Sequence, residues 1–290
     1  MGVVLFDLSV FLRVKLAEDR LIFWGTRGGL PSGEITSAKY GLATSCVELS
    51  FSDRHIILDA GSGISLFGKQ IDLNDKKPID ILIGHYHYDH LIGLPFFLPL
   101  FSGNHAVRIF LPELEGKNGI EAIDKLISPP LFPITKDMFS NNVSFHSFVP
   151  GETLTLGLHY TIETSLFPHP GQNCGYRLNR RDRNILCYIS DIENNAESTL
   201  DDVIKFVKNC NHLIIDSSYT KEEAKSRKGW GHLSLDDIEI IASRLPGVQI
   251  YLYHHDIFKT DSQVEMDSLK LLNEYNNVKL AKQLDVVELS

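Results

Sequence analysis

The segment HYHYDH at residues 85–90 constrains the fold more than any other stretch of this sequence. It follows the apolar run IDILIG, which is typical of a buried β-strand. On an extended chain, side chains two residues apart point to the same side, so His85 and His87 can converge on one point. Asp89 and His90 follow as the chain turns, and they are aimed at a neighbouring point. Imidazoles and carboxylates are common metal ligands, so this spacing predicts a strand that ends at two adjacent metal ions.

Three more candidate ligands stand where apolar runs end. His169 follows LFP, Asp191 ends ILCYISD, and His254 ends the run IYLYH. Sheet proteins often place functional side chains at such strand ends. A single histidine there is more often structural than a ligand, but together with residues 85–90 the three complete a His/Asp set. The adjacent His255 leaves open which histidine of that pair is the ligand.

Short β-branched runs alternate with helical patterns along the whole chain. This mixture predicts an α/β (α+β) fold of two packed sheets with helices outside, arranged as one domain over 1–290 without a linker. Ser234 with Asp237, and Ser262 with Glu265, predict capping boxes at helix starts. The predicted strands begin near residues 21, 45, 55, 79, 107, 143, 160, 184, 212 and 248.

Two segments stand apart from this pattern. Residues 1–19 are apolar, but Asp7 interrupts the run and no basic region precedes it, so a signal sequence is not favoured. We expect an N-terminal extension that adds a strand or helix to the domain. The stretch 112–142 is rich in proline and asparagine and predicts an insertion or lid, with one short helix at 119–127.

Composition narrows the function classes. The net charge of −9 argues against an extended nucleic-acid surface, although it permits a small anionic substrate held by metal ions. No apolar run is long enough for a membrane span. None of the four cysteines forms a CxxC pair and each lies in or beside an apolar run, so we expect reduced thiols and a cytoplasmic protein. These residues are Cys46, Cys174, Cys187 and Cys210.

The order HxHxDH, then His, Asp and His, resembles the metallo-β-lactamase fold hydrolases. The resemblance is greatest to the branch that contains ribonuclease Z and small cyclic-phosphate phosphodiesterases, and it runs from about residue 20 to 270. It implies a four-layer αββα sandwich of two mixed sheets. One departure is Gly84, which stands where threonine or serine is common. The motifs that carry the resemblance are FWGTRGGLP, YGLATSCVEL, LDAGSGI, HYHYDHLIGLPFF, GYRL, DSSYTKEE, KGWGHLS and HHD.

The resemblance also implies an assignment of the ligands to two divalent ions. Asp191 would bridge both ions, and Asp59 in LDAGSG would orient the first ligands. A ligand set of nitrogen and oxygen without cysteine favours Zn²⁺, with Mn²⁺ as the alternative. One ion would be held by His85, His87 and His169, and the other by Asp89, His90 and His254.

A further histidine, His232 in KGWGHLS, is a candidate catalytic residue. It precedes Ser234, which is expected to start a helix, and helix N-termini favour anions. His232 is therefore placed to touch a phosphate or to protonate a leaving oxygen, and the resemblance implies such a role. A helix-capping histidine is the structural alternative. Arg27 and Ser234 are candidate substrate contacts, although a salt bridge would explain Arg27 equally well.

These features together predict a metal-dependent phosphodiesterase. Two ions about 3.5–4 Å apart would share a water and lower its pKa towards ~7, so that a bridging hydroxide attacks a small or cyclic phosphodiester. Asp89 is a candidate to orient that hydroxide, and a cyclic nucleotide is the favoured substrate. The apolar segment LPFFLPLF at 94–101 is a candidate homodimer contact or part of the core.

Four alternatives remain at this level. A ribonuclease Z-like RNA 3′-processing endonuclease is the first, although the sequence has no evident basic arm to grip RNA. A glyoxalase II-like thioesterase shares HxHxDH and the bridging aspartate, but it has no obvious use for GWGHLS. A β-lactamase is disfavoured because its second site typically lacks this bridging aspartate. A metal-free binding or sensor protein on the same scaffold is disfavoured because all seven ligand positions are intact.

Overall fold

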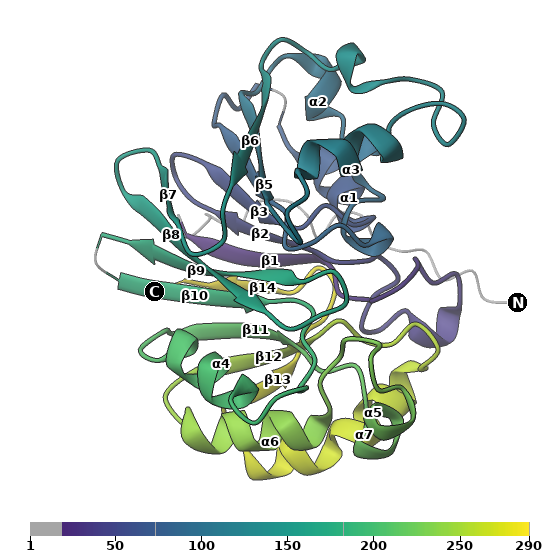
Figure 1. Cartoon of the computed structure of the whole chain (residues 1–290), viewed down its shortest axis with the longest axis vertical. Helices are drawn as coiled ribbons and strands as arrows, with labels where there is room; N and C mark the ends of the chain where they lie inside the picture. The colour runs from purple at the N-terminus through teal and green to yellow at the C-terminus, as the bar shows by residue number, and fades with distance from the viewer. Residues whose placement is uncertain (1–18, 73, 182, 290) are drawn as a thin grey trace, which may run out of the picture.

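The protein folds into two β-sheets that pack face to face, with helices on both outer sides (Figure 1). The structure is a computed structural model that describes residues 19–72, 74–181 and 183–289. The expected N-terminal extension therefore lies almost wholly outside the described residues. The predicted four-layer αββα sandwich is confirmed.

The first sheet has seven strands in the order β14-β1-β2-β3-β4-β5-β6. Its strands from β3 to β6 run parallel, whereas β14, β1, β2 and β3 pair antiparallel. The parallel part explains why residues that follow β3 and β4 meet at one edge. The bounds are Arg20–Gly25 (β1), Cys46–Ser50 (β2), His55–Leu58 (β3), Ile79–Leu82 (β4), Val107–Pro112 (β5), Val143–Phe148 (β6) and Val286–Glu288 (β14).

The second sheet repeats this plan with the order β13-β12-β11-β10-β9-β8-β7. Strands β10 to β13 are parallel, and β7 to β10 are antiparallel. The ten predicted strands are present, but β7, β9, β13 and β14 were not among them. The bounds are Thr153–Leu156 (β7), Tyr160–Phe167 (β8), Asn173–Arg180 (β9), Arg183–Ile189 (β10), His212–Asp216 (β11), Gln249–Tyr253 (β12) and Val278–Leu280 (β13).

Three apolar clusters hold the four layers together. The central cluster lies between the sheets and contains Leu49 from β2 and Tyr188 from β10. A second cluster packs Val203 of α4 and Ile241 of α6 against the second sheet, and a third packs Phe67 of α1 against the first sheet. The helices are α1 (Gly63–Gln70), α2 (Pro99–Ser102), α3 (Gly119–Leu126), α4 (Thr199–Val207), α5 (Lys221–Ser226), α6 (Leu235–Arg244) and α7 (Asp261–Glu274).

Helix starts follow capping chemistry, with one correction. Ser234 and Asp237 form the predicted capping box of α6. The predicted box of Ser262 with Glu265 is wrong, because α7 begins two residues earlier, after the N-cap Thr260. Helix α3 lies within the predicted 119–127 segment. Among the described helices, none is long and apolar enough to cross a membrane.

Candidate metal centre

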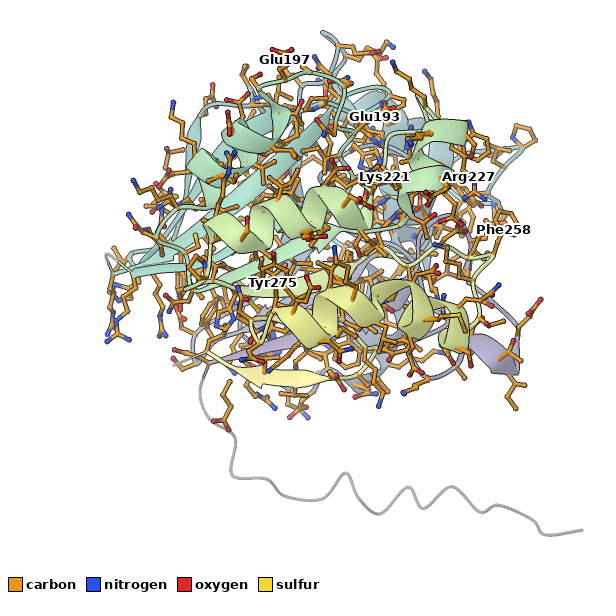
Figure 2. The ribbon with its side chains drawn as sticks, turned by 90° about the horizontal axis from the view of Figure 1, so that it is seen from below. Glu193, Glu197, Lys221, Arg227, Phe258 and Tyr275 are labelled. Carbon is orange, nitrogen blue, oxygen red and sulfur yellow. The ribbon has the colours of Figure 1, made fainter. Side chains whose placement is uncertain are left out.

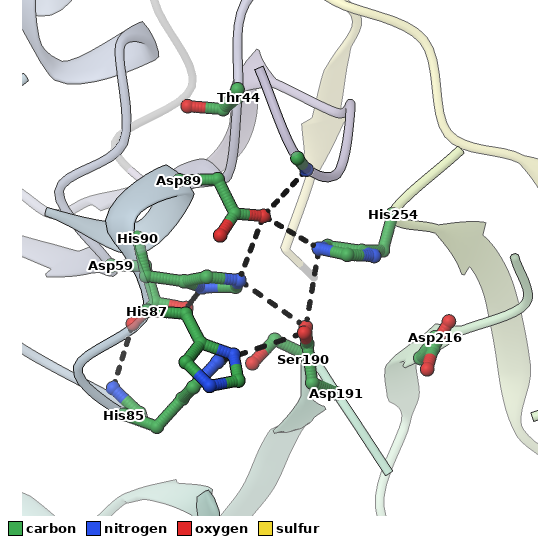
Figure 3. A network of polar contacts seen from close by, with 12 residues as sticks. Thr44, Asp59, His85, His87, Asp89, His90, Ser190, Asp191, Asp216 and His254 are labelled. Carbon is green, nitrogen blue, oxygen red and sulfur yellow. Dashed lines mark hydrogen bonds and ion pairs between the residues drawn. The ribbon is translucent and has the colours of Figure 1, made fainter. Parts of the chain in front are cut away.

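The predicted ligands meet at one edge of the sandwich, where strands of both sheets end (Figure 3). His85 lies just beyond β4, and the short 3-10 helix Tyr88–His90 turns the chain so that Asp89 and His90 face inward. The second sheet contributes three residues from the ends of β8, β10 and β12, namely His169, Asp191 and His254. Each sheet therefore supplies about half of the centre.

The first ligand cluster consists of His85, His87 and His169 around one carboxylate oxygen of Asp191. Asp191 Oδ2 lies 3.7 Å from both His85 Nε2 and His169 Nε2. His169 Nε2 lies 3.0 Å from His87 Nδ1. His87 is exposed, whereas the other three residues are buried, so the cluster opens to solvent on the His87 side.

The second cluster consists of Asp89, His90 and His254, and it faces the other oxygen of the same carboxylate. Asp191 Oδ1 lies 3.3 Å from His90 Nε2 and 3.4 Å from His254 Nε2. Asp89 Oδ2 lies 3.4 Å from His90 Nε2 and 3.1 Å from His254 Nε2. Asp191 thus stands between the two clusters with one oxygen directed at each.

The spacing of these atoms fits metal coordination. Four ligands placed tetrahedrally at about 2.05 Å from one ion are about 3.3 Å apart, which lies within the 3.0–3.7 Å separations seen here. Several buried ligand atoms also lack any hydrogen-bond partner, which is costly unless an ion satisfies them. These atoms are both ring nitrogens of His85, Nε2 of His90 and Oδ1 of Asp191. The residues present can therefore hold metal ions.

The electrostatics of the clusters point to the same conclusion. Burial lowers the pKa of all three imidazoles of the first cluster, which keeps them neutral as metal ligands must be. Burial opposes ionisation of Asp89 and Asp191, yet the surrounding histidines hold the pKa of both well below the usual value. Burial likewise opposes charge on His90, but nearby carboxylates raise its pKa well above the usual value. The buried carboxylates thus stabilise positive charge at this site, and a bound cation would supply it.

Hydrogen bonds behind the ligands fix their orientation. Asp59, directly after β3, accepts hydrogen bonds at Oδ2 from His90 Nδ1 and from the hydroxyl of Tyr188, each at 2.7 Å. His169 Nδ1 donates to the carbonyl of Gly231 at 2.9 Å. His254 Nδ1 lies 3.2 Å from Ser218 Oγ. These partners select which ring nitrogen of each histidine faces the centre.

Residues 54–255 match a family model described as a beta-lactamase superfamily domain. This range holds all seven ligand residues and Asp59.

The chain belongs to the beta-lactamase superfamily.

Individual relatives in this superfamily are more distant. A ribonuclease Z of Clostridium perfringens is 27% identical over 171 residues, which cover 56% of this chain and 51% of that protein. The chain therefore spans about half the length of this curated relative. The metallo-beta-lactamase fold protein YhfI from Bacillus subtilis is 19% identical with a TM-score of 0.68, covering 93% of this chain and 98% of that one. A diphosphatase from the PhnP family is 15% identical with a TM-score of 0.67, covering 94% and 98%.

Gly84, which stands where the family commonly has serine or threonine, leaves room for the side chain of Asn173. A Cβ atom there would lie 2.8 Å from Asn173 Oδ1. Asn173, from the unpredicted strand β9, donates to the carbonyl of Asp191 at 2.6 Å. The backbone nitrogen of Gly84 donates to Asp59 Oδ1 at 2.7 Å. Asn173 and this backbone donor thus provide polar contacts beside the ligands where a serine or threonine side chain is absent.

The glycine-rich segment after β1 reaches the centre through its backbone. Gly29 N donates to Asp89 Oδ2 at 2.7 Å, and a Cβ on Gly28 would lie 2.1 Å from the ring of His254. The prediction that Arg27 contacts substrate is wrong, because its side chain is fully buried. Its guanidinium donates to protein acceptors, namely the carbonyls of Ser37, Gly41, Asp256 and Lys259 and the carboxylate of Asp261.

His232 lies beside the second cluster and is held by a residue that sequence reasoning missed. Its Nδ1 donates to Asp216 Oδ2 at 2.9 Å, and its ring stacks on that of His254 at 4.9 Å. Burial opposes protonation, but the carboxylate of Asp216 outweighs it and raises the pKa of His232 to about 9. Because Nδ1 is occupied, Nε2 is the nitrogen available to a substrate. Asp216 ends the run HLIID and opens the motif DSSYTKEE, but neither feature of the sequence indicated that it would hold His232.

Two neighbouring residues have structural roles. Ser234 caps α6 and its hydroxyl donates to Asp237 Oδ2 at 2.6 Å, so the prediction that Ser234 contacts substrate is wrong. The structure also distinguishes the adjacent histidines, because His255 Nε2 donates to the carbonyl of Ala281 at 2.8 Å, away from the cluster. Burial lowers the pKa of His255 to about 3, consistent with a neutral structural histidine.

The predicted insertion borders the centre. A cavity of about 200 Å³ is lined on one side by His85 and His87 and on the other by Lys117, Asn118 and Lys125. Lys117, Asn118 and Lys125 belong to the connection between the parallel strands β5 and β6. The insertion therefore forms a wall beside the first cluster, which is where a lid would have to lie.

Proposed function

We propose that the protein is a metal-dependent hydrolase of phosphodiesters, acting on a small or cyclic phosphodiester such as a cyclic nucleotide. The observation that carries this proposal is the carboxylate of Asp191, which directs one oxygen at each ligand cluster. That arrangement suits two divalent ions side by side, with zinc favoured and manganese as the alternative. When bound, such a pair supplies an activated water and draws charge from the phosphoryl oxygens.

The chain's own residues supply orientation and a proton. Asp89 is fixed by the backbone of Gly29 and faces the second cluster, where its carboxylate can accept a hydrogen bond from the attacking water. His232, paired with Asp216, carries a proton at Nε2 that can pass to the leaving oxygen. General acid help of this kind is typically worth a factor of about 10²–10⁴ in rate.

A ribonuclease Z-like activity on RNA is the second candidate, and the match to the Clostridium perfringens protein favours it. The net charge of −9 disfavours it, because a broad grip on an RNA backbone needs clustered basic side chains. A small substrate needs only the local charge of the metal centre. The two candidates therefore differ in the size of the substrate and share the phosphodiester chemistry.

A phosphodiester panel tests the proposal. The purified protein with added Zn²⁺ or Mn²⁺ should hydrolyse bis(p-nitrophenyl) phosphate or a cyclic nucleotide and lose that activity with chelator. Asp191→Ala prepared in the same way excludes a contaminating enzyme, and Asp202→Ala on the exposed face of α4 is the matched control. Cleavage of a glutathione thioester with phosphodiesters left intact would replace this proposal with the thioesterase. Cleavage of a precursor transfer RNA alone would favour the second candidate.

The proposed homodimer rests on the segment 94–101. Phe96, Leu98 and Phe101 of this segment are exposed, whereas Phe97 and Leu100 are buried in the core, so only part of the segment can contact a partner. The mass of the protein in solution, measured by light scattering for the wild type and Phe96→Ser, tests this contact. The free cysteines support the proposed cytoplasmic location.

A further inference from the structure

A second cavity lies on the other side of the centre from the insertion. It has a volume of about 140 Å³ and begins at His232 and His254. Its outer walls come from two loops, the segment before α6 and the segment after β12. The proposed reaction needs only the histidine end of this cavity, so the outer part is left without a role.

Two large aromatic rings line the outer part and are open to solvent. Trp230 is 60% exposed and Phe258 is 80% exposed. Figure 2 shows Arg227 and Phe258 on the same side of the molecule, at the end of the helical layer. A single exposed apolar side chain is common on a protein surface, but two large exposed rings that line one concave site indicate a binding surface.

The loop that carries Trp230 is held in place rather than free. Arg227 forms an ion pair with Asp256 at 2.7 Å, and its guanidinium lies 4.9 Å from the ring of Tyr219 and 5.7 Å from that of Trp230. Tyr219 in turn packs edge-on against His232. A continuous row of ring and guanidinium contacts, through Tyr219 and Arg227, therefore leads from the proposed proton donor to the exposed indole.

The two glycines around Trp230 make this loop geometry possible. Gly229 and Gly231 have φ values of 86° and 92°, which side-chain-bearing residues rarely adopt. A Cβ on Gly231 would lie 2.2 Å from the ring of His169. The position of Trp230 is thus tied to a residue of the first ligand cluster.

We propose that this cavity binds the planar ring of the substrate, a nucleobase, stacked on Trp230 and Phe258 while the phosphodiester lies at the metal centre. This inference rests on the proposed function for the place of the phosphate and adds the residues that would bind the base. Every base has a π-face, so stacking on exposed aromatic side chains binds nucleotides with little dependence on sequence.

The size of the cavity supports one ring system and no more. Pockets for whole ligands commonly span about 300–1,000 Å³, so the cavity is small beside them. A folded RNA would also need basic side chains, but the ion pair of Arg227 with Asp256 leaves this wall with little net charge. A mononucleotide fits both constraints better than an oligonucleotide.

The protein contains its own probe for this contact. It has two tryptophans, and Trp24 is buried, so the exposed indole of Trp230 is the one that added ligands can reach. We expect adenosine 5′-monophosphate to quench the fluorescence of the Zn²⁺-loaded protein, and ribose 5-phosphate to leave it unchanged at the same concentration. Trp230→Phe should abolish the signal but retain most of the affinity measured by calorimetry.

Truncation of the ring should weaken binding by a predictable factor. Base stacking on one aromatic side chain corresponds to roughly a 5- to 150-fold change in affinity. Trp230→Ala should weaken adenosine 5′-monophosphate by this factor and leave ribose 5-phosphate unchanged. Leu158→Ala, which removes an exposed side chain elsewhere, is the matched control and should change neither affinity.

A kinetic comparison separates this inference from the proposed function. Thymidine 5′-(p-nitrophenyl phosphate) and methyl p-nitrophenyl phosphate share a leaving group and differ in the nucleoside. Trp230→Ala should raise KM for the first ester alone. If both esters are hydrolysed without discrimination and the two monophosphates bind equally, the base-binding inference is overturned and the phosphodiesterase stands. If neither ester is hydrolysed but adenosine 5′-monophosphate still quenches Trp230 selectively, the phosphodiesterase fails and the base site stands.

Discussion

Asp59 and Asp216 are two fully buried aspartates from opposite sheets, and each holds one histidine. Asp59 follows β3 and accepts hydrogen bonds from a ligand histidine, a tyrosine hydroxyl and a backbone amide. Asp216 ends β11 and accepts hydrogen bonds from His232 at Oδ2 and from Ser218 at Oδ1. Both appear in Figure 3, on opposite sides of Asp191.

The difference lies in what each aspartate reaches. Asp59 orients His90 of the second ligand cluster and also holds the backbone of Gly84, directly before His85 of the first cluster. Asp216 touches His232 directly and reaches His254 through the hydroxyl of Ser218. Under the proposed function, Asp59 would therefore support metal coordination through His90, and Asp216 would support proton transfer through His232. Substitutions that separate metal content from turnover test this division.

The largest effect is expected for Asp191→Ala. The loss of metal and turnover in this variant is the reference for the effects of substituting Asp59 and Asp216. Removing this carboxylate takes an oxygen from each ligand cluster. We expect metal content after gel filtration to fall close to zero and phosphodiesterase turnover to fall to background. Full metal occupancy in Asp191→Ala would mean that the two clusters do not share this residue.

The next effect concerns His232 and its partner. His232→Ala should keep its metal and lose about 10²–10³-fold in kcat, because it removes a donor to the leaving oxygen. A ligand variant such as His87→Ala should instead lose metal and activity together. The exposed His159 provides a control, and His159→Ala should retain both. Loss of metal in His232→Ala would make this residue a ligand and contradict its assignment as a proton donor.

Asp216→Asn should act through the proton of His232. The Asp216 carboxylate raises the pKa of His232, so its neutralisation should lower that pKa. Activity that needs protonated His232 falls as pH rises through this pKa, so the alkaline limb of the pH–rate profile should move to lower pH. Asp202→Ala, which removes a carboxylate on the exposed face of α4, should leave that limb in place. An unmoved limb in Asp216→Asn would remove His232 as the general acid.

Asp59→Asn should act on metal affinity alone. Replacing a residue that orients a metal-bound histidine typically costs about 10–100-fold in affinity. We expect a loss of this size when zinc is titrated against a competing chelator, with kcat recovered at saturating zinc. A kcat that stays low at saturating zinc would place Asp59 in the same class as Asp216.

The smallest effect is expected beside Asp59, at Gly84. A serine there would crowd Asn173 Oδ1, and overpacking of this kind typically costs about 1–3 kcal/mol. Gly84→Ser should therefore lower the free energy of unfolding measured in urea. Combining it with Asn173→Ala should recover part of the loss relative to the sum of the two single changes. Strict additivity of the two would show that Asn173 does not occupy this space.

The periodicity of apolar residues predicted most strands and helices. It failed for strands that form only because neighbouring strands pair with them. Strand β9 has the sequence NCGYRLNR, which lacks alternation, and it forms because β8 and β10 supply partners on both sides. Its Gly175 packs directly under the ring of Phe167. The start of α7 was misplaced because Thr260 and Gln263 form the capping box two residues earlier, and Glu265 instead accepts a hydrogen bond from the hydroxyl of Tyr40.

The positions of the candidate ligand residues were predictable because they follow local rules. Each stands at a strand end, and two-residue spacing places His85 and His87 on one side. Asp216 also ends a strand, but its partner His232 lies in a separate loop. No local sequence pattern predicts that these two residues meet. Arg27 failed as a substrate contact for the same reason, since its acceptors Lys259 and Asp261 lie in a segment that meets it only in the folded chain. Ser234 follows a local rule, because its acceptor Asp237 lies three residues later in the predicted capping box.

The division of the ligands between two sheets has a consequence for mechanical integrity. His90 comes from the first sheet and His254 from the second, and 163 residues of chain lie between them. An ion held by both would act as a cross-link between the two halves of the sandwich. Because such an ion binds the folded chain and not the unfolded one, each tenfold rise in its concentration above Kd adds about 1.4 kcal/mol to the resistance to unfolding. The concentration of available metal would then set the stability of the contact between the two sheets, as well as the activity of the site.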